Sequence, residues 1–207
     1  MDPRNPEQHA RPSRQAFLFG LSAGAASLAL SSRALAKMRK RSSGAMRALY
    51  LQRLDTGEIC DAAFTVDGRS VYYGGLGGQI GGYKNICYAL RDDHVPLSVG
   101  FQPISLWTIQ VLWEIQQTLA SVGVRNRIVV HSGYRSPQTN FETENAARNS
   151  QHLYGRAVDF HVPGVPIDYL YRVARSQPYS GGVGYYPRNG GGGWIHVDTW
   201  LRREWAG

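Results

Sequence analysis

Alternating apolar and polar residues predict a β-hairpin in residues 46–68, with its turn at Asp55–Glu58. Apolar side chains at helical spacing predict a core helix in residues 105–122, with Ser105 as its N-cap and Gly123 as its stop. Further short elements follow, in the order strand 127–136, strand 155–162, helix 168–176, strand 181–187 and strand 193–200. This mixture predicts an α+β domain with an antiparallel sheet and flanking helices.

Polar residues interrupt two of these strands in a way that points to a metal site. Successive side chains of a strand point to opposite faces, so Asp159 shares a face with His161, and His196 shares one with Asp198. If the two strands are neighbours, these groups converge on one surface. His152 lies seven residues before Asp159.

Two histidines and a carboxylate are a ligand set for catalytic zinc, which keeps its fourth position open for water. We therefore predict that His152, Asp159 and His196 bind Zn²⁺. The alternative is structural: a strand histidine is often hydrogen-bonded scaffolding, and Asp159 alone can cap a turn or pair with Arg156.

The N-terminal segment has the pattern of an export signal. Arg4, Arg11 and Arg14 precede an apolar stretch at residues 16–30, and the small-residue run Ala34–Ala36 suits cleavage. The stretch is short for a membrane span, which needs ~20 residues. We predict a signal peptide at 1–36, a flexible basic leader at 37–45 and one domain at 46–207, located in the periplasm or cell envelope without a membrane anchor.

The export route is open. The run Ser13–Gly20 resembles the twin-arginine motif, but Gln15 stands where the second arginine belongs. The net charge of the 207-residue chain is +8, and the mature part stays basic after cleavage. This favours an anionic partner such as cell-wall polymer, although a solvated basic face is an equal alternative. Nucleic acid is not expected, because no zinc-finger spacing or basic-aromatic motif is present.

Cys60 and Cys87 are too few for a disulfide framework. In an oxidising compartment they would pair and cross-link the N-terminal half, whereas in a reducing one they would be buried thiols. Since the chain carries an export signal, we favour a single disulfide.

Four ordered motifs carry a family resemblance. They are residues 132–140, 150–164, 181–187 and 194–199, and residues 49–58 resemble the family's start. Together they resemble the murein endopeptidase K (YcbK-like) family of exported proteins. That family is related to the zinc D-alanyl-D-alanine peptidases and to the hedgehog signalling-domain fold, so the resemblance implies this fold for most of the mature chain.

The resemblance also implies roles for individual residues. His152, Asp159 and His196 match the zinc ligands, and Arg135 matches an arginine placed over the substrate carbonyl. Ser150 stands beside the first ligand in a substrate-contacting or loop-fixing role. Aromatic residues in a small sheet domain are usually core, but Tyr185 has the best claim to a substrate groove because its motif recurs in the resemblance.

The catalytic base is unassigned by this resemblance. Many D-alanyl-D-alanine peptidases carry a glutamate three residues before the last histidine ligand, where this chain has Gly193. His161 is our candidate base or transition-state donor, and Asp198 is a second candidate that can instead orient a ligand histidine. Glu142 and Glu144 are candidates for a lid.

The resemblance implies a zinc peptidase that hydrolyses stem-peptide cross-links of peptidoglycan, and we expect the chain to be a monomer. The alternative is a non-catalytic wall-binding or signalling module that retains the fold, an idea to which Gly193 gives weight.

Overall fold

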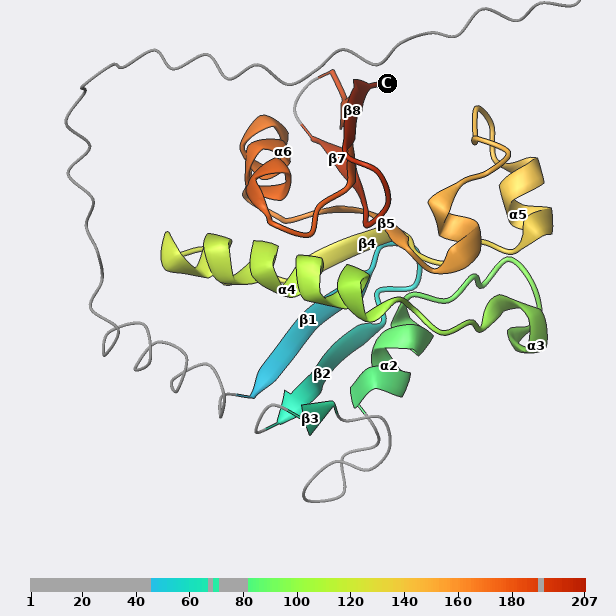
Figure 1. The fold of residues 1–207 in the computed structure, drawn as a ribbon, viewed down its shortest axis with the longest axis horizontal. Coiled ribbons are helices and arrows are strands. Elements are labelled where there is room, and N and C mark those ends of the chain that lie inside the picture. The colour runs from blue at the N-terminus through green and yellow to red at the C-terminus, as the bar shows by residue number, and fades with distance from the viewer. Residues whose placement is uncertain (1–45, 67–68, 71–81, 190–191) are drawn as a thin grey trace, which may run out of the picture.

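The computed structural model describes residues 46–66, 69–70, 82–189 and 192–207, and Figure 1 shows their arrangement. The predicted signal peptide and leader, residues 1–36 and 37–45, lie outside this range. The elements in chain order are β1 Arg47–Arg53, β2 Ile59–Val66, β3 Arg69–Ser70, α2 Gly82–Ala89, α3 Leu97–Gly100, α4 Leu106–Ser121, β4 Ile128–Ser132, α5 Pro137–Glu142, the 3₁₀ helix η1 Gln151–Tyr154, β5 Ala157–His161, α6 Ile167–Ser176, β6 Gly182–Pro187, β7 Gly193–Asp198 and β8 Arg203–Ala206.

The strands form one sheet in the order β3-β2-β1-β4-β5-β7-β6-β8. The α+β class is confirmed, but the sheet is mixed, because β1 pairs with β4 and β6 pairs with β8 in parallel. The prediction of an antiparallel sheet is therefore wrong at these two positions. Between β1 and β4 the chain crosses over through helices, which returns β4 in the direction of β1. The last strand, β8, adds to the outer edge of the β6–β7 hairpin.

Most of the predicted elements are present. β1 and β2 form the predicted hairpin, with Gln52 opposite Ile59. α4 begins directly after Ser105, and the later predicted elements appear as β4, β5, α6, β6 and β7. The pattern does not predict α2, α3, α5, η1 or β8, because each has only four to eight residues and shows too little periodicity.

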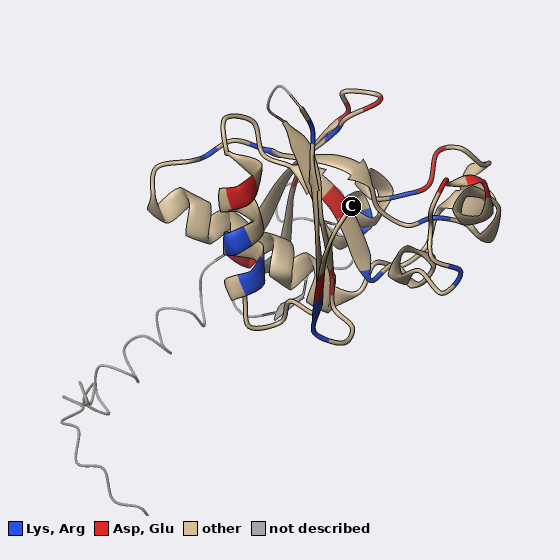
Figure 2. Cartoon of the chain, turned by 90° about the horizontal axis from the view of Figure 1, so that it is seen from above, with Lys and Arg blue, Asp and Glu red and all other residues tan. Residues whose placement is uncertain are grey.

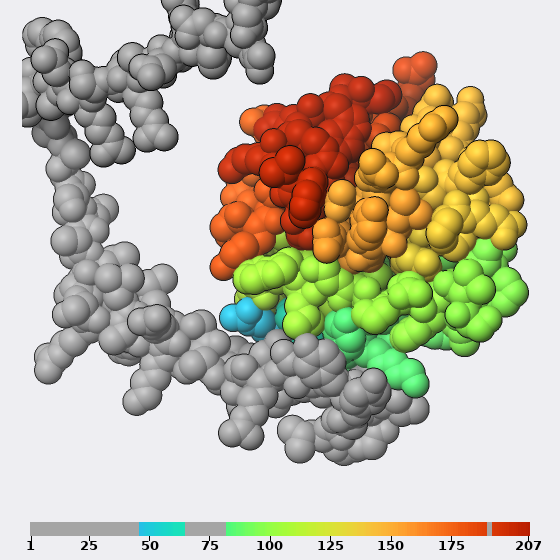
Figure 3. All heavy atoms as spheres, turned by 45° about the vertical axis from the view of Figure 1, so that its right-hand side comes forward, coloured from blue at the N-terminus to red at the C-terminus, as the bar shows by residue number. Residues whose placement is uncertain are grey.

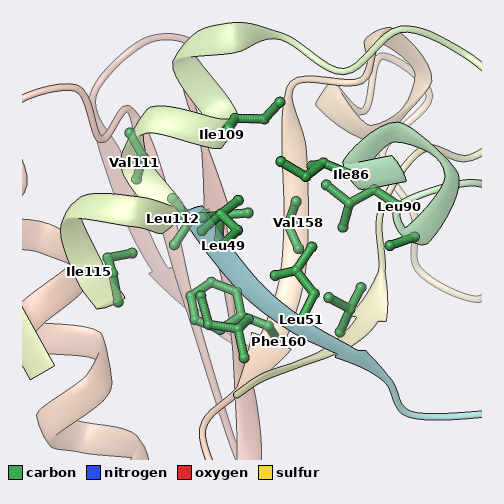
Figure 4. Close-up of a cluster of buried hydrophobic side chains, with 14 of the residues drawn as sticks. Leu49, Leu51, Ile86, Leu90, Ile109, Val111, Leu112, Ile115, Val158 and Phe160 are labelled. Atoms are coloured by element: carbon green, nitrogen blue, oxygen red, sulfur yellow. The ribbon is translucent and has the colours of Figure 1, made fainter. Parts of the chain in front are cut away.

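The hydrophobic core lies between the sheet and the helices α2, α4 and α6, which contact its strands. Figure 4 shows Leu49 and Leu51 of β1 packed with Leu112 of α4 and Phe160 of β5. Since Phe160 of β5 is fully buried in this core, its neighbours Asp159 and His161 project from the opposite face of the sheet. The fold thus leaves one face of β5 and β7 free for polar side chains.

Cys60 and Cys87 are free and buried, which corrects the predicted disulfide. Both thiols belong to the hydrophobic core. Burial, followed by the charge of Asp61, raises the pKa of Cys60 to about 12. Cys87 Sγ accepts a hydrogen bond from the backbone N–H of Ile104 at 3.4 Å. The two residues therefore act as small apolar side chains.

Phe160 offers a test of this core. The change Phe160→Ala removes a fully buried ring under the polar face, so we expect a loss of ~3–5 kcal/mol in the free energy of unfolding. Urea denaturation measures this loss. Ile59→Ala is the control, because Ile59 is 59% exposed and its truncation leaves no cavity. Equal losses for the two variants would contradict the assigned core.

Candidate metal centre

The pairing of β5 with β7 brings two of the predicted ligands together. Asp159 lies directly opposite His196 in the antiparallel ladder, and both side chains point away from the core. His196 is only 8% exposed and Asp159 only 6%. The period-two argument from the sequence therefore describes this face correctly.

The third predicted ligand, His152, comes from the 3₁₀ helix η1. Ser150 caps this helix, with its side chain accepting a hydrogen bond from the backbone N–H of His152. Gly155 ends it in the left-handed region at φ 62°. A Cβ at Gly155 would lie 2.6 Å from the carbonyl oxygen of Pro103, so this position requires glycine. The short helix then directs His152 toward Asp159 of β5 and His196 of β7, where it is 2% exposed.

Three ligand atoms meet in a small triangle. His152 Nε2 lies 3.2 Å from Asp159 Oδ1 and 3.1 Å from His196 Nδ1, and the last two atoms lie 2.8 Å apart. Tetrahedral zinc, with bonds of ~2.0–2.2 Å to nitrogen and oxygen, separates its ligand atoms by about 3.3 Å. The triangle therefore has nearly the size that a bound zinc ion requires.

In each histidine, the ring nitrogen that faces away from the triangle, here called the outer nitrogen, already has a hydrogen-bond partner. His152 Nδ1 donates to the carbonyl oxygen of Gly133 at 2.6 Å, and His196 Nε2 lies 3.2 Å from Asp198 Oδ2. With a proton on each outer nitrogen, the inner nitrogens of the neutral rings carry lone pairs directed at Asp159. Three proton acceptors then face one another in a buried space, and a cation between them relieves this repulsion. The donor set fits a metal ion.

The electrostatics of the protein chain alone agree with this arrangement. Burial lowers the pKa of His152, while the pKa of Asp159 lies well below its usual value because contacts with both histidines outweigh its desolvation. Burial also acts to lower the pKa of His196, but its contacts with Asp159 and Asp198 outweigh burial and raise it. The raised pKa of His196 thus reflects the attraction of these two carboxylates for positive charge at the triangle.

Asp198, predicted as a catalytic candidate, is fully buried beside His196. Its Oδ2 accepts a hydrogen bond from Arg203 Nη2 at 2.6 Å. Its Oδ1 accepts the backbone N–H groups of Gly182 and Trp200, each at 2.9 Å. All of these contacts hold the carboxylate on the outer side of the His196 ring, which suits a group that orients the ring.

His161, the predicted base, does not line the cavity around the triangle. A register shift in β4 makes His131 an extra residue between Val130 and Ser132. His131 Nε2 then bonds His161 Nδ1 at 2.7 Å. The shift is not visible in the sequence pattern, and it turns His161 toward a second histidine instead of the triangle.

Arg135 reaches the triangle from the loop after β4. Its Nη2 binds Asp159 Oδ2, the oxygen that does not face the two histidines, and its Nε binds Ser132 Oγ at 2.8 Å. The backbone N–H of Arg135 also donates to the carbonyl oxygen of His152. The structure thus brings this predicted residue to the edge of the site.

A cavity of about 390 Å³ opens over the triangle. One wall is the segment 143–152, and the other is formed by Tyr186, Trp194, Arg203 and Trp205. Figure 3 shows the two contributing segments, coloured gold and red, side by side on one face of the molecule. Arg203 and Trp205 come from β8, whose arrival at this site has no signal in the sequence motifs.

The structure does not bring Tyr185 to this cavity, which corrects the sequence prediction. Its ring packs against Tyr171 of α6, with ring centroids 5.4 Å apart. The next residue, Tyr186, lines the cavity and stacks on Trp194 at 5.1 Å with nearly parallel rings. Since Val183 is buried in the core, period two already assigns Tyr185 to the core side of β6.

Gly193 has no room for the glutamate of related peptidases. It adopts φ 113°, and a Cβ there would lie 2.2 Å from the carbonyl oxygen of Tyr186. Among the described residues that line the cavity, the carboxylates are Asp159 and Glu144. Glu144 is exposed, and it lines the cavity together with other residues of the segment 143–152.

Known proteins resemble this chain over most of its length. The family model described as peptidoglycan L,D-endopeptidase MepK matches residues 41–205. The chain belongs to this family. The probable peptidoglycan L,D-endopeptidase MepK of Haemophilus influenzae is 33% identical over 166 residues, covering 78% of this chain and 80% of the relative. The peptidoglycan L,D-endopeptidase MepK of Escherichia coli K12 is 32% identical over 163 residues, covering 77% and 80%.

Two broader features bear on the surroundings of this MepK-family domain. None of its described helices is long and apolar enough to cross a membrane. In Figure 2 the Lys and Arg residues of the described chain lie at separate places around the domain, with acidic residues between them. The basic excess of the sequence therefore does not form one continuous face in this part of the chain.

The pair of His131 and His161 predicts a pH dependence of stability. Burial, and then the neighbouring His161, lower the pKa of His131 to about 4, against ~6.5 in the unfolded chain. The unfolded state therefore binds more protons in this range, and stability is lost as pH falls from ~6.5 to 4. Because His131 is only half-buried and solvent screens the effect, we expect about 1 kcal/mol, or ~2–4 °C in Tm.

The change His131→Gln should remove this contribution. Between pH 7.5 and 4.5, with chelator present, the melting temperature of the wild-type protein should therefore fall by ~2–4 °C more than that of the variant. Melting curves that stay parallel across this range would show that His131 does not titrate as described.

Proposed function

We propose that this chain is an exported zinc metallopeptidase that hydrolyses peptide cross-links of peptidoglycan. One observation carries the proposal: three buried acceptor atoms, on His152, Asp159 and His196, converge within 3.2 Å at the floor of an open cavity. Membership of the MepK family supplies the substrate class. The names of the relatives support L,D-cross-links as the bond that is cleaved.

His152, Asp159 and His196 would hold the zinc ion through Nε2, Oδ1 and Nδ1. When bound, zinc polarises a carbonyl group and lowers the pKa of water toward ~7, which makes amide hydrolysis feasible at neutral pH. The protein keeps both histidine rings in the required tautomer through the Gly133 carbonyl and the Asp198 carboxylate. Asp198 is thus proposed as a positioning residue.

Arg135 is proposed to stabilise the negative charge that develops on the scissile carbonyl oxygen. Its guanidinium borders the cavity and is held by Ser132 and Asp159. Ser150 is proposed to fix the loop, because its hydroxyl caps the helix that carries His152. These roles leave the proton acceptor to be assigned.

Glu144 is our candidate for that acceptor. It lines the cavity on the wall opposite the aromatic side chains and takes part in no ion pair with a described residue. A carboxylate in reach of an attacking water can take its proton. His161 is less suited, because its Nδ1 is bound to His131.

Action on peptidoglycan would place the mature chain in the periplasm or cell envelope, in agreement with the signal-like segment 1–36. We propose that it acts there as a monomer with Zn²⁺ as its cofactor. A non-catalytic wall-binding module is the second candidate. Gly193, in place of the usual glutamate, is the observation that favours it.

A murein digest separates these two functions. Purified chain is incubated with cross-linked murein in the presence of zinc or of chelator, and the muropeptides are resolved. We expect cross-linked dimers to disappear only with zinc, and the position of the cut to show which cross-link is cleaved. His152→Ala should lose both zinc and activity, whereas the control Arg172→Ala, at an exposed residue of α6 outside the cavity, should keep both. Unchanged cross-links in a zinc-loaded sample would leave only the binding module.

Glutamine variants test the proton acceptor. We expect Glu144→Gln to lower kcat by ~10²–10⁴-fold with zinc content unchanged, because the amide cannot accept the proton. The matched control is Glu142→Gln, since Glu142 lies two residues earlier, at the end of α5, outside the cavity wall and bound to Gln138. If His161→Gln causes the large loss and Glu144→Gln does not, the base is His161.

A further inference from the structure

We infer that Tyr186 is a further catalytic residue, whose hydroxyl donates a hydrogen bond to the carbonyl oxygen of the scissile bond. The inference rests on the proposed function and adds a donor on the wall facing Arg135. The proton stays on the phenol oxygen, so no bond to it is broken. The hydrogen bond strengthens as the carbonyl carbon becomes tetrahedral and its oxygen gains negative charge.

The register of the sheet directs Tyr186 to the site. It lies opposite Trp194 on β7, in the same ladder in which Gly184 lies opposite His196. Its side chain lines the cavity whose floor is formed by His152, Asp159 and His196. Tyr186 thus lies two residues along β6 from Gly184, on the same face of the sheet, and Gly184 is the residue paired with His196.

The hydroxyl of Tyr186 is bound by Trp205, a residue of β8 whose ring packs against His196. Trp205 Nε1 donates to Tyr186 Oη at 2.7 Å. The same Nε1 would lie 2.8 Å from a Cβ built on Gly184, and the Trp205 ring centroid lies 5.1 Å from that of His196. The Tyr186 oxygen is therefore held by an indole that lies over Gly184 and packs against the His196 ring. Glycine is required at 184 because any side chain there would displace the indole.

The hydroxyl proton of Tyr186 remains available for a ligand. An indole N–H only donates, so Tyr186 Oη accepts in its contact with Trp205. Within the part of the chain that the structure describes, no acceptor binds the hydroxyl proton in return. Accepting one hydrogen bond also polarises the phenol and makes it a stronger donor.

The ring of Tyr186 is held before any substrate arrives. Trp194 stacks on it with an interplanar angle of 5°. A Cβ at Gly207 would lie 2.2 Å from Tyr186 Cε1, so the chain end packs closely against the ring. A donor fixed in this way needs no reorganisation during the reaction, which is the condition under which such donors contribute most.

Arg135 and Tyr186 thus approach the cavity from different sides. Arg135 comes from the loop after β4, whereas Tyr186 comes from β6. A carbonyl oxygen in the cavity would meet a guanidinium from one side and a phenol from the other. This arrangement explains two residues that the metal ligands alone do not require. Gly184 leaves room for the indole of Trp205, and Trp205 holds the Tyr186 hydroxyl.

Tyr186→Phe is the test, because it keeps the ring and its stacking and removes only the hydroxyl. We expect kcat on cross-linked muropeptides to fall by ~10²–10³-fold, with KM within about twofold and zinc content unchanged. Tyr185→Phe is the matched control, since that ring packs on α6, and it should retain wild-type activity. Trp205→Phe removes the donor to Oη and should lower kcat by a smaller factor.

A binding measurement supplies a readout separate from turnover. A phosphinate peptide imitates the tetrahedral carbon and its charged oxygen, and Tyr186→Phe should weaken its binding by about the factor lost in kcat/KM. A kcat within threefold of wild type, a loss confined to KM, or an equal loss in Tyr185→Phe would overturn the role of Tyr186. Failure of the wild-type protein to cleave murein would instead overturn the proposed function.

Discussion

The site depends on a repulsion that the fold builds in: three proton acceptors lie 2.8–3.2 Å apart in a buried space. They cannot relieve it with the protons of the histidines, because the Gly133 carbonyl and the Asp198 carboxylate hold those protons on the outer nitrogens. Something positive must lie between the acceptors. Burial acts to lower the pKa of His196, but its contacts with Asp159 and Asp198 outweigh burial and raise it, which reflects the negative potential at this point. A metal ion between the acceptors would relieve the repulsion.

The sheet prevents Asp159 and His196 from moving apart to relieve this repulsion. The facing residues Asp159 and His196 sit on adjacent strands whose other faces are packed into the core through Phe160 and Ile195. Moving either side chain far from its partner would require a shift of the ladder, and a shift by one residue would bury the polar groups. The same rigidity extends to β6 and β8, which present Tyr186 and Trp205 to the cavity.

Strand periodicity in the sequence was enough to predict that Asp159 shares a face with His161, and His196 with Asp198, because it depends only on local geometry. That these faces form one surface depended on β5 and β7 being neighbours, which the structure supplies. The same rule, started from buried Val183, would have chosen Tyr186 over Tyr185, so that miss had a usable signal. Other features of the fold had no such signal in the sequence. The extra residue His131 in β4, the parallel pairing of β1 with β4, and the arrival of β8 arise from long-range pairing, which neither spacing nor propensity encodes.

The missing glutamate follows from the same long-range pairing. At Gly193 the chain turns into β7 with φ 113° and passes so close to the Tyr186 carbonyl that no side chain fits. That close approach belongs to the hairpin that stacks Trp194 on Tyr186, so the aromatic wall and a base at position 193 exclude each other. If the proton acceptor is a carboxylate of the cavity wall, as proposed, it comes from the segment 143–152, where Glu144 lies.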